Sequence, residues 1–317
     1  MFEFKSNFAP LIKEYAKYRN TLKFSDTHEK ILSYFDDYCY RNYPDCNELS
    51  FSLVKEWFKF EQDIRPGRLR DFYFAINGFS KYINRADCVL PESFLQRKKS
   101  PPIPYIMTQE ELFGFFDALN SLRWADPLSA VTMGCMIRLM YSSGLRPNEA
   151  RQLKRENIAL ETGLIKIEYT KRHGKRIVVL SEDMTELLKN YDVLRNALVP
   201  VSEYFFVLSN GEYISQAFLW RSVNRSWKIV TSNSKEHPLI NPYTFRHQFA
   251  STILMKWLDE GKDLYAMIPY LKAYMGHKHF SSTVYYIHIL PQKLLDSPNM
   301  DWEKFDLIGK DENIWEN

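Results

Sequence analysis

The chain has 317 residues, a length that suggests about two domains, each able to bury its own core. Its 42 Lys and Arg against 39 Asp and Glu leave a net charge of +3, which excludes a polycation that coats nucleic acid by bulk charge. With 45% hydrophobic residues and only 11 glycines, the composition indicates a folded, helix-rich protein and argues against a glycine-lined nucleotide site.

The N-terminal part, residues 1–96, has the pattern of a helical domain. Apolar and aromatic residues recur at helical spacing, and a basic turn, Arg65-Pro66-Gly67-Arg68, separates the last two helices. The predicted helices cover residues 2–23, 27–42, 51–64 and 69–86. We therefore predict an N-terminal bundle of four or five helices.

A linker is predicted over residues 97–106. Pro101, Pro102 and Pro104 interrupt any helix there, because each proline lacks an amide donor and restricts the residue before it. A second domain then covers 107–317.

The second domain begins with a capping box, Thr108 with Glu111, at the start of a helix that runs to residue 122. Gly144 is expected to end a further helix, and Pro147 to begin the next. The predicted helices cover 111–122, 130–143, 148–157 and 181–194. The predicted strands are 164–170 and 175–180, joined by a hairpin at 171–174, with a possible short strand at 205–208.

Four segments of the second domain contain residues suited to phosphate chemistry. They are GLRPNEARQL (144–153), KRHGKRIVVL (171–180), NPYTFRHQFAS (241–251) and LKAYMGHKHFSSTVYYIHI (271–289). In this order they resemble the motifs of the tyrosine recombinase (phage integrase) family: GLR-x-x-E, a lysine on a β-hairpin, H-x-L-R-H-x-F-A, and Gly-His followed nine residues later by tyrosine. The resemblance extends over nearly the whole chain.

The resemblance implies a mainly α fold with a small antiparallel β-sheet or hairpin. A helical, SAM-like core-binding domain would occupy residues 1–96, and a tyrosine recombinase catalytic domain residues 107–317. We expect no arm-binding domain before them, so the expected architecture is Xer-like.

The resemblance also implies a catalytic site without metal or other cofactor. Its expected members are Arg146, Lys171, Tyr243, Arg246, His277 and Tyr286. Two arginines suit a phosphodiester because their guanidinium groups stay protonated and donate paired hydrogen bonds to phosphoryl oxygens. Tyr286 is the expected nucleophile, which forms a 3′-phosphotyrosyl link and frees a 5′-hydroxyl. Its spacing from His277 favours it over Tyr285. His277 is expected to donate to the phosphate or to position the nucleophile.

The sequence does not assign the general acid and the proton acceptor to single residues, because more than one group is a candidate for each role. Lys171 is the expected general acid, and Lys175 replaces it if the hairpin register differs. Tyr243 stands where the family usually has histidine, and a phenol with an ordinary pKa near 10 is a poor base. Water or another group must then accept the proton of the nucleophile, or the enzyme is slow or inactive. Glu149 and His247 are expected to support the reacting groups indirectly.

Local clusters of basic residues are expected to bind DNA phosphates. The last 17 residues hold six acidic and two basic residues, which leaves a net charge of +7 on residues 1–300. The candidates for DNA contact are Arg65, Arg68, Arg70, Arg97, Lys98, Lys99, Arg172, Lys175, Arg221, Arg225 and Lys228. The resemblance implies a homotetramer on two double-stranded DNA sites with inverted-repeat cores. The segment after Tyr286 would dock on a neighbouring protomer or pack on its own chain.

The function expected from these motifs is site-specific DNA recombination through a covalent intermediate, as in integration. Two alternatives remain: a DNA-binding protein of recombinase fold with weak or no catalysis, and a strand-passing enzyme like the type IB topoisomerases. The four cysteines form no CxxC pair, and the N-terminus lacks the apolar run of a secretory signal. We therefore expect a soluble, cytoplasmic protein that does not bind a membrane.

Overall fold

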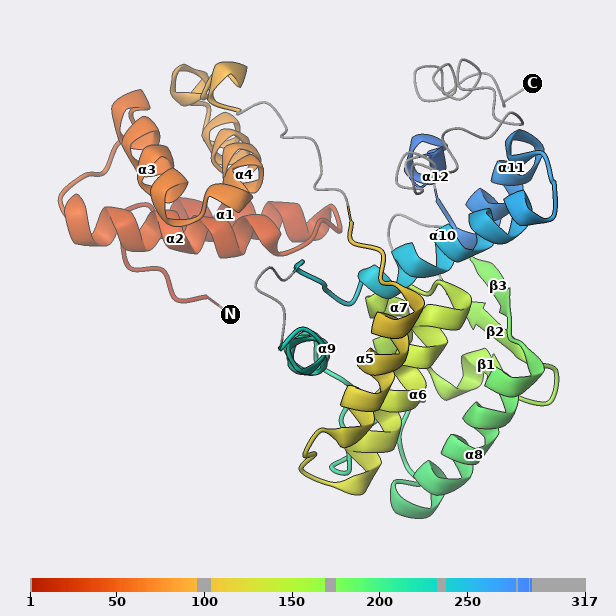
Figure 1. Ribbon diagram of the computed structural model, residues 1–317. Coiled ribbons are helices and arrows are strands. Elements are labelled where there is room, and N and C mark those ends of the chain that lie inside the picture. Colours follow the sequence, from red (N-terminus) through yellow and green to blue (C-terminus); the bar gives the residue numbers. More distant parts are fainter. Residues whose placement is uncertain are drawn as a thin grey trace. The chain divides into compact units, whose positions relative to one another are not determined.

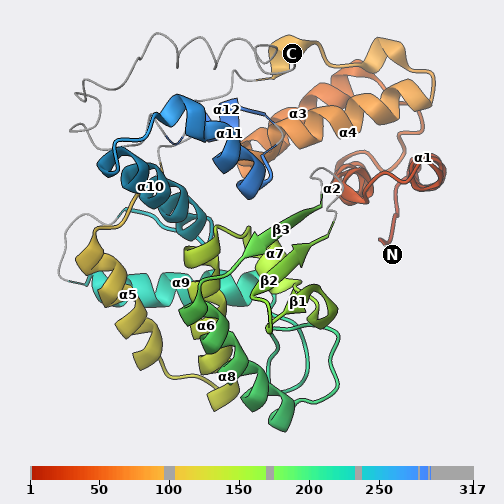
Figure 2. The ribbon, with the colours of Figure 1, turned by 90° about the vertical axis from the view of Figure 1, so that its right-hand side faces the viewer.

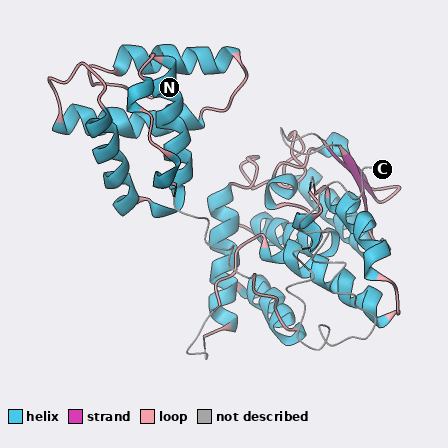
Figure 3. Ribbon diagram, turned by 90° about the horizontal axis from the view of Figure 1, so that it is seen from above, coloured by secondary structure: helices cyan, strands magenta, loops and turns pink. Residues whose placement is uncertain are grey.

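The computed structural model describes residues 2–95, 104–168, 175–232, 238–277, 279–284 and 286. The chain divides into two compact units, Met1–Pro101 and Pro102–Asn317. The division lies within residues 97–106, while the bounds predicted for the linker stay a prediction. Helices predominate in both units, and the described strands form one small sheet in the second unit (Figure 3). The mainly α fold class is confirmed.

The described part of the first unit is a bundle of α-helices with short 3₁₀ turns. The α-helices are α1 (Ala9–Thr21), α2 (Thr27–Asn42), α3 (Phe51–Ile64) and α4 (Leu69–Tyr82), and the turns are η1 (Pro66–Arg68), η2 (Ala86–Cys88) and η3 (Glu92–Phe94). Helices α2 and α3 both pack against α4 (Figure 1). Phe35, Trp57 and Phe72 meet edge to face in the core between them.

The helix predicted from residue 2 begins only at Ala9. Two observations explain the difference. Pro10 lacks an amide hydrogen and is tolerated only in the first turn of a helix. The preceding amides of Lys5 and Ser6 donate to the buried carboxylate of Asp36 on α2, at 2.6 and 3.1 Å. The first residues are therefore tied to α2 instead of forming another helical turn.

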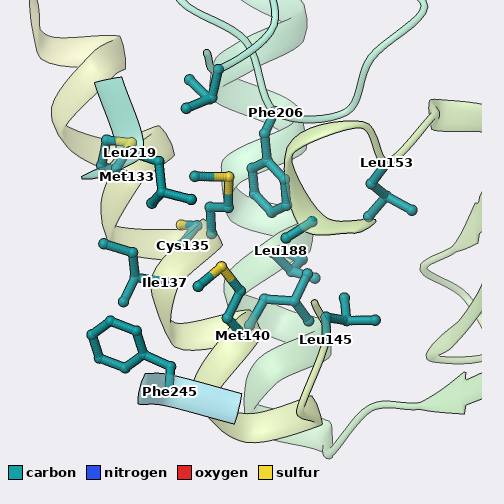
Figure 4. Packing of buried hydrophobic residues seen from close by; sticks show 14 of the residues in the cluster. Met133, Cys135, Ile137, Met140, Leu145, Leu153, Leu188, Phe206, Leu219 and Phe245 are labelled. Atoms are coloured by element: carbon teal, nitrogen blue, oxygen red, sulfur yellow. The ribbon is translucent and has the colours of Figure 1, made fainter. Parts of the chain in front are cut away.

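The second unit surrounds one buried helix, α6. Its helices are α5 (Gln109–Ser121), α6 (Pro127–Ser143), α7 (Pro147–Arg151), η4 (Arg155–Asn157), α8 (Glu182–Leu198), α9 (Gln216–Val230), α10 (Thr244–Asp259), α11 (Leu264–Met275) and α12 (Ser281–Val284). Helix α6 packs against α5, α8 and α10 (Figure 2). Its side chains Met133, Ile137 and Met140 are fully buried among apolar neighbours (Figure 4). The site described below is built at the C-terminal end of this helix.

The sheet of the second unit is antiparallel, in the order β1-β2-β3. The strands are β1 (Ile158–Ala159), β2 (Leu164–Ile167) and β3 (Arg176–Val179). In the register of β2 with β3, Ile165 pairs with Val178, and both side chains are buried. The predicted hairpin is thus present, with its tip, residues 169–174, outside the described residues.

One predicted helix in this unit is shorter than expected. The helix predicted over 148–157 is α7, which ends at Arg151, and η4 follows. The helix ends there because the backbone of residues 153–155 pairs with the distant residues 203–205. The Phe205 amide donates to the Leu153 carbonyl at 2.7 Å, and the Arg155 amide donates to the Glu203 carbonyl at 3.0 Å. The possible strand at 205–208 forms no regular strand, and its neighbourhood holds only isolated bridges.

Local signals at helix ends are confirmed. Thr108 and Glu111 form the predicted capping box of α5. Gly144 ends α6 in the left-handed conformation, with φ of +63°. Among the helices that the structure describes, none has the length and apolarity needed to cross a membrane.

Substitution of Gly144 by alanine is expected to destabilise the protein. A Cβ at this position would lie 2.4 Å from the Cδ1 of Phe249, and the left-handed backbone already disfavours a side chain. We expect Gly144→Ala to lower the free energy of unfolding by about 2–5 kcal/mol, from backbone strain and overpacking together. Gly261→Ala is the control, because Gly261 has φ of +68° but open space around it. Urea unfolding of both variants checks this, and equal losses would contradict the packing argument.

Candidate active site

Four of the predicted catalytic residues converge where three helices meet. Helix α10 packs against both α6 and α11, and α11 also contacts β3 (Figure 2). Arg146 is the residue before α7, and Arg246 lies in the first turn of α10. His277 follows α11, and Tyr286 follows α12. Three of the four motif segments, distant in the sequence, thus contribute these residues to one site.

Arg246 is held by two helix ends. It is 1% exposed, and its guanidinium donates to the carbonyls of Gly144 (2.6 Å) and Met275 (2.7 Å). These carbonyls end α6 and α11, where the helix dipole is negative. Burial and the charge of Arg146 lower the pKa of Arg246 to about 10. The side chain is therefore still a cation at neutral pH, with its orientation set before any ligand binds.

Arg146 is oriented by a neighbouring carboxylate and by the loop after α11. Its Nη1 donates to Glu149 at 2.9 Å and its Nη2 to the Gly276 carbonyl at 2.8 Å. The Arg146 amide also donates to Glu149, at 2.8 Å. The arginine side chain is 12% exposed, against 3% for Glu149. The cation therefore reaches the surface, whereas the carboxylate stays beneath it.

Sequence reasoning missed one residue of this cluster, Arg176. Its two terminal nitrogens donate to the two oxygens of Glu149 at 2.8 and 2.7 Å, and an added Cβ on Gly276 would lie 3.1 Å from its Cδ. The signal was present, because strand alternation places Arg176 on the same face as buried Val178. Arg176 thereby ties the hairpin strand β3 to Glu149.

Glu149 is ionised between its two arginines. Burial of the carboxyl favours the neutral acid, but the hydrogen bonds and charges of Arg176 and Arg146 outweigh burial and lower its pKa to about 2. A folded-state pKa below the ordinary value means that this stabilisation is present above about pH 4.5 and is lost as the pH falls toward 2.

This pKa predicts an acid-dependent gap in stability between wild type and Glu149→Gln. We expect wild type to be the more stable protein at pH 6, and the gap to shrink by about 3 kcal/mol between pH 6 and pH 2. Urea unfolding of both proteins across this range measures the gap. A gap that is constant with pH would show that Glu149 is not ionised by its arginine partners.

Tyr286 lies buried between two histidines. The His277 ring stacks on the tyrosine ring, with centroids 5.9 Å apart and planes inclined by 14°. The Nε2 of His277 is 2.9 Å from Nη2 of Arg246, and its Nδ1 is 2.8 Å from the hydroxyl of Thr283. In addition, His247 Nδ1 lies 3.1 Å from the Tyr286 hydroxyl. The structure therefore brings Tyr286 and His277 to the buried arginine.

Burial also sets the protonation of this group. It raises the pKa of Tyr286, although the nearby Arg246 cation opposes the effect. Burial, with the charge of Arg246, lowers the pKa of His247 to about 4. At neutral pH the tyrosine is therefore a phenol and His247 a neutral imidazole.

The remaining predicted catalytic residues are Tyr243 and Lys171. Tyr243 is 44% exposed, with its ring centroid 6.2 Å from that of His247. Lys171 lies outside the described residues, as does Arg172. Lys175, the alternative general acid, is exposed and directly precedes β3.

The basic residues predicted to contact DNA occupy different settings. In the first unit, Arg65 pairs with the buried carboxylate of Glu61, and Arg68 lies 3.7 Å from Asp71, whereas Arg70 is exposed. Arg97, Lys98 and Lys99 lie outside the described residues. In the second unit, Arg221, Arg225 and Lys228 are exposed on one face of α9, at helical spacing. The three α9 residues, called the α9 trio below, therefore form an exposed basic surface. Arg65, in contrast, already forms an ion pair within its own unit, with Glu61.

Within the described ranges, no cluster of three His, Cys, Asp or Glu side chains is arranged to hold a metal ion. The polar groups around Tyr286 are guanidinium groups, imidazoles and a hydroxyl, which suit an anionic substrate.

Comparison with known proteins agrees with the motifs. The family model of the phage integrase family matches residues 106–293. The tyrosine recombinase XerD of Staphylococcus aureus (strain N315) is 27% identical over 225 residues, covering 70% of this chain and 69% of that protein. A tyrosine recombinase of Thermosipho africanus (strain TCF52B) is 26% identical over 256 residues, covering 78% and 76%. The XerH recombinase, solved with its difH substrate before cleavage, shares the fold with a TM-score of 0.61 at 22% identity, over 92% of this chain and 84% of that one. The chain therefore belongs to the phage integrase family of tyrosine recombinases.

Proposed function

We propose that the protein cleaves and rejoins DNA strands at specific sites, with Tyr286 as nucleophile. One observation carries this proposal: a buried tyrosine hydroxyl lies in the same cluster as a buried arginine, whose orientation is set by two helix ends. The tyrosine also stacks on a histidine that contacts that arginine. Such a cluster combines a nucleophile with donors for an anionic phosphate.

In the proposed reaction, Arg146, Arg246 and His277 bind the non-bridging oxygens of the scissile phosphate. The Tyr286 oxygen attacks phosphorus, the bond to the 5′-oxygen breaks, and a 3′-phosphotyrosyl link forms. Lys171, or Lys175 in the alternative register, protonates the leaving 5′-oxygen. The link conserves the energy of the broken bond, so rejoining requires no ATP.

The partner in this proposal is double-stranded DNA with inverted-repeat core sites, bound by four protomers on two sites. XerH, of similar fold, was solved after cleavage on a palindromic difH substrate. In this chain, the exposed α9 trio (Arg221, Arg225 and Lys228) and exposed Arg70 are the described surfaces suited to DNA phosphates.

A plasmid assay tests the proposed function. Supercoiled plasmids carrying two directly repeated copies of the recombination site, or none, are incubated with the protein without ATP. Site-specific recombination gives a deletion product only from the two-site plasmid. Relaxation of both plasmids without a deletion product would identify a topoisomerase-like activity instead. Binding of the site without any cut product would identify a DNA-binding protein of recombinase fold.

A further inference from the structure

We propose that His247 is the general base of strand cleavage and takes the proton of the Tyr286 hydroxyl. This inference rests on the proposed function and supplies the acceptor that Tyr243 leaves open. The imidazole Nδ1 of His247 lies 3.1 Å from the hydroxyl oxygen of Tyr286, within reach for direct proton transfer. The ring centroids are 5.4 Å apart.

The position of His247 on α10 explains how it takes over this role. Tyr243 precedes α10, and His247 stands four residues later, one helical turn along the same face. Tyr243 is 44% exposed, whereas His247 is partly buried beside the nucleophile. The proton acceptor is therefore displaced by one turn from the position where the family usually has histidine.

The protonation states fit a donor and an acceptor. Burial and the Arg246 charge keep His247 neutral, with a pKa of about 4, so that one ring nitrogen has a lone pair at neutral pH. Burial raises the pKa of Tyr286, so its hydroxyl still carries the proton to be transferred. With its own proton on Nε2, the imidazole accepts the hydrogen bond of the hydroxyl at Nδ1.

Neighbouring bases are engaged elsewhere. The Nε2 of His277 faces the N–H of Arg246 at 2.9 Å, and its Nδ1 faces Thr283 at 2.8 Å. Glu149 accepts hydrogen bonds from both Arg146 and Arg176. The Nδ1 of His247, by contrast, lies 3.1 Å from the Tyr286 hydroxyl.

The proposed step balances as follows. The Tyr286 oxygen forms a bond to phosphorus, its proton passes to Nδ1 of His247, and the bond from phosphorus to the 5′-oxygen breaks. The resulting imidazolium lies next to Arg246, whose charge disfavours it in the free protein. The bound phosphate offsets that charge, so binding of substrate raises the basicity of His247. In rejoining, the imidazolium returns its proton to the departing tyrosine oxygen.

The test is single-turnover cleavage of a nicked suicide substrate by His247→Asn at saturating protein. Asparagine keeps a hydrogen-bonding group near the hydroxyl but cannot take a proton. We expect cleavage at pH 7 to slow by about 10²–10⁴-fold. Wild type should be nearly independent of pH between 7 and 9. The variant should gain about tenfold per pH unit, because only ionised Tyr286 then reacts and its pKa lies above this range.

The pH profile also depends on the groups around the pair. Among the described residues, the charged and titratable groups near His247 and Tyr286 are Tyr243 before α10, Arg246 in α10, Arg146 before α7 and His277 after α11. Arg246, with a pKa of about 10, is mainly cationic up to pH 9. His28→Asn is the matched control, because His28 Nδ1 also lies 3.1 Å from a tyrosine hydroxyl, that of Tyr15, in the first unit. It should keep the wild-type profile.

A second variant separates proton transfer from packing. In His247→Ala, added imidazoles should restore cleavage, and the more basic imidazoles should restore it more. If the added imidazole only filled the cavity left by the substitution, the rate would not depend on its basicity. Wild-type rates in His247→Asn, or a slow variant with a flat pH profile and no rescue of His247→Ala, would overturn the assignment. If wild type itself forms no adduct while it binds the site, the proposed function fails, and with it the step in which His247 acts.

Discussion

Tyr286→Phe is expected to abolish the covalent protein–DNA adduct on a nicked suicide substrate. The substitution removes only the oxygen that would bond to phosphorus, and the ring can still stack on His277. Loss of the nucleophile from covalent enzymes reduces the rate on the order of 10⁶-fold, which places the adduct below detection on a denaturing gel. DNA binding, measured by gel shift, should change little.

The control is Tyr285→Phe, which changes the adjacent tyrosine, a residue outside the described structure. This variant should still form the adduct. An adduct that persists in Tyr286→Phe and disappears in Tyr285→Phe would reverse the assignment of the nucleophile. Adduct formation by both variants would point to a different nucleophile, and with it to a different site.

Arg246→Lys is expected to slow cleavage by about 10²–10³-fold while the protein still binds DNA. In the wild-type protein, the planar guanidinium of Arg246 donates to the carbonyls of Gly144 and Met275 and also contacts His277. A lysine ammonium is a single point of charge and cannot span these partners and a phosphate together. Single-turnover cleavage at saturating protein measures the effect apart from affinity.

Arg195→Lys is the matched control for Arg246→Lys. Arg195 is also fully buried, and it also donates to backbone carbonyls, those of Ser202 and Tyr204, at the end of α8. Both variants should lose stability, since each leaves buried carbonyls with poorer donors. Only Arg246→Lys should lose cleavage by the folded protein. Equal cleavage defects would show that the loss follows from unfolding.

The sequence predicted those features that depend on local chemistry. The capping box at Thr108 and the helix end at Gly144 are confirmed because each is set by residues within one or two turns. The family is confirmed because its motifs keep their order and spacing. The joining of Arg146 to Glu149 follows from the spacing of three residues at the start of a helix.

Features that depend on distant partners were not predictable in this way. The start of α1 depends on Asp36, and the end of α7 depends on pairing of Leu153 with Phe205. Arg176 acquires its role only when β3 lies beside Glu149, 27 residues earlier in the chain. The position of His247 against Tyr286 likewise requires two segments 39 residues apart to fold together.

The shared carboxylate of Glu149 has a consequence for the response of the site to heat. The desolvation penalty of buried charges falls as temperature rises, because hydration of ions becomes less favourable. On warming, the ion pairs of Glu149 with Arg146 and Arg176 should therefore persist until the surrounding hydrophobic core unfolds. Activity should rise with temperature up to the unfolding transition and then fall with it, without an earlier decline from local melting of the arginine cluster.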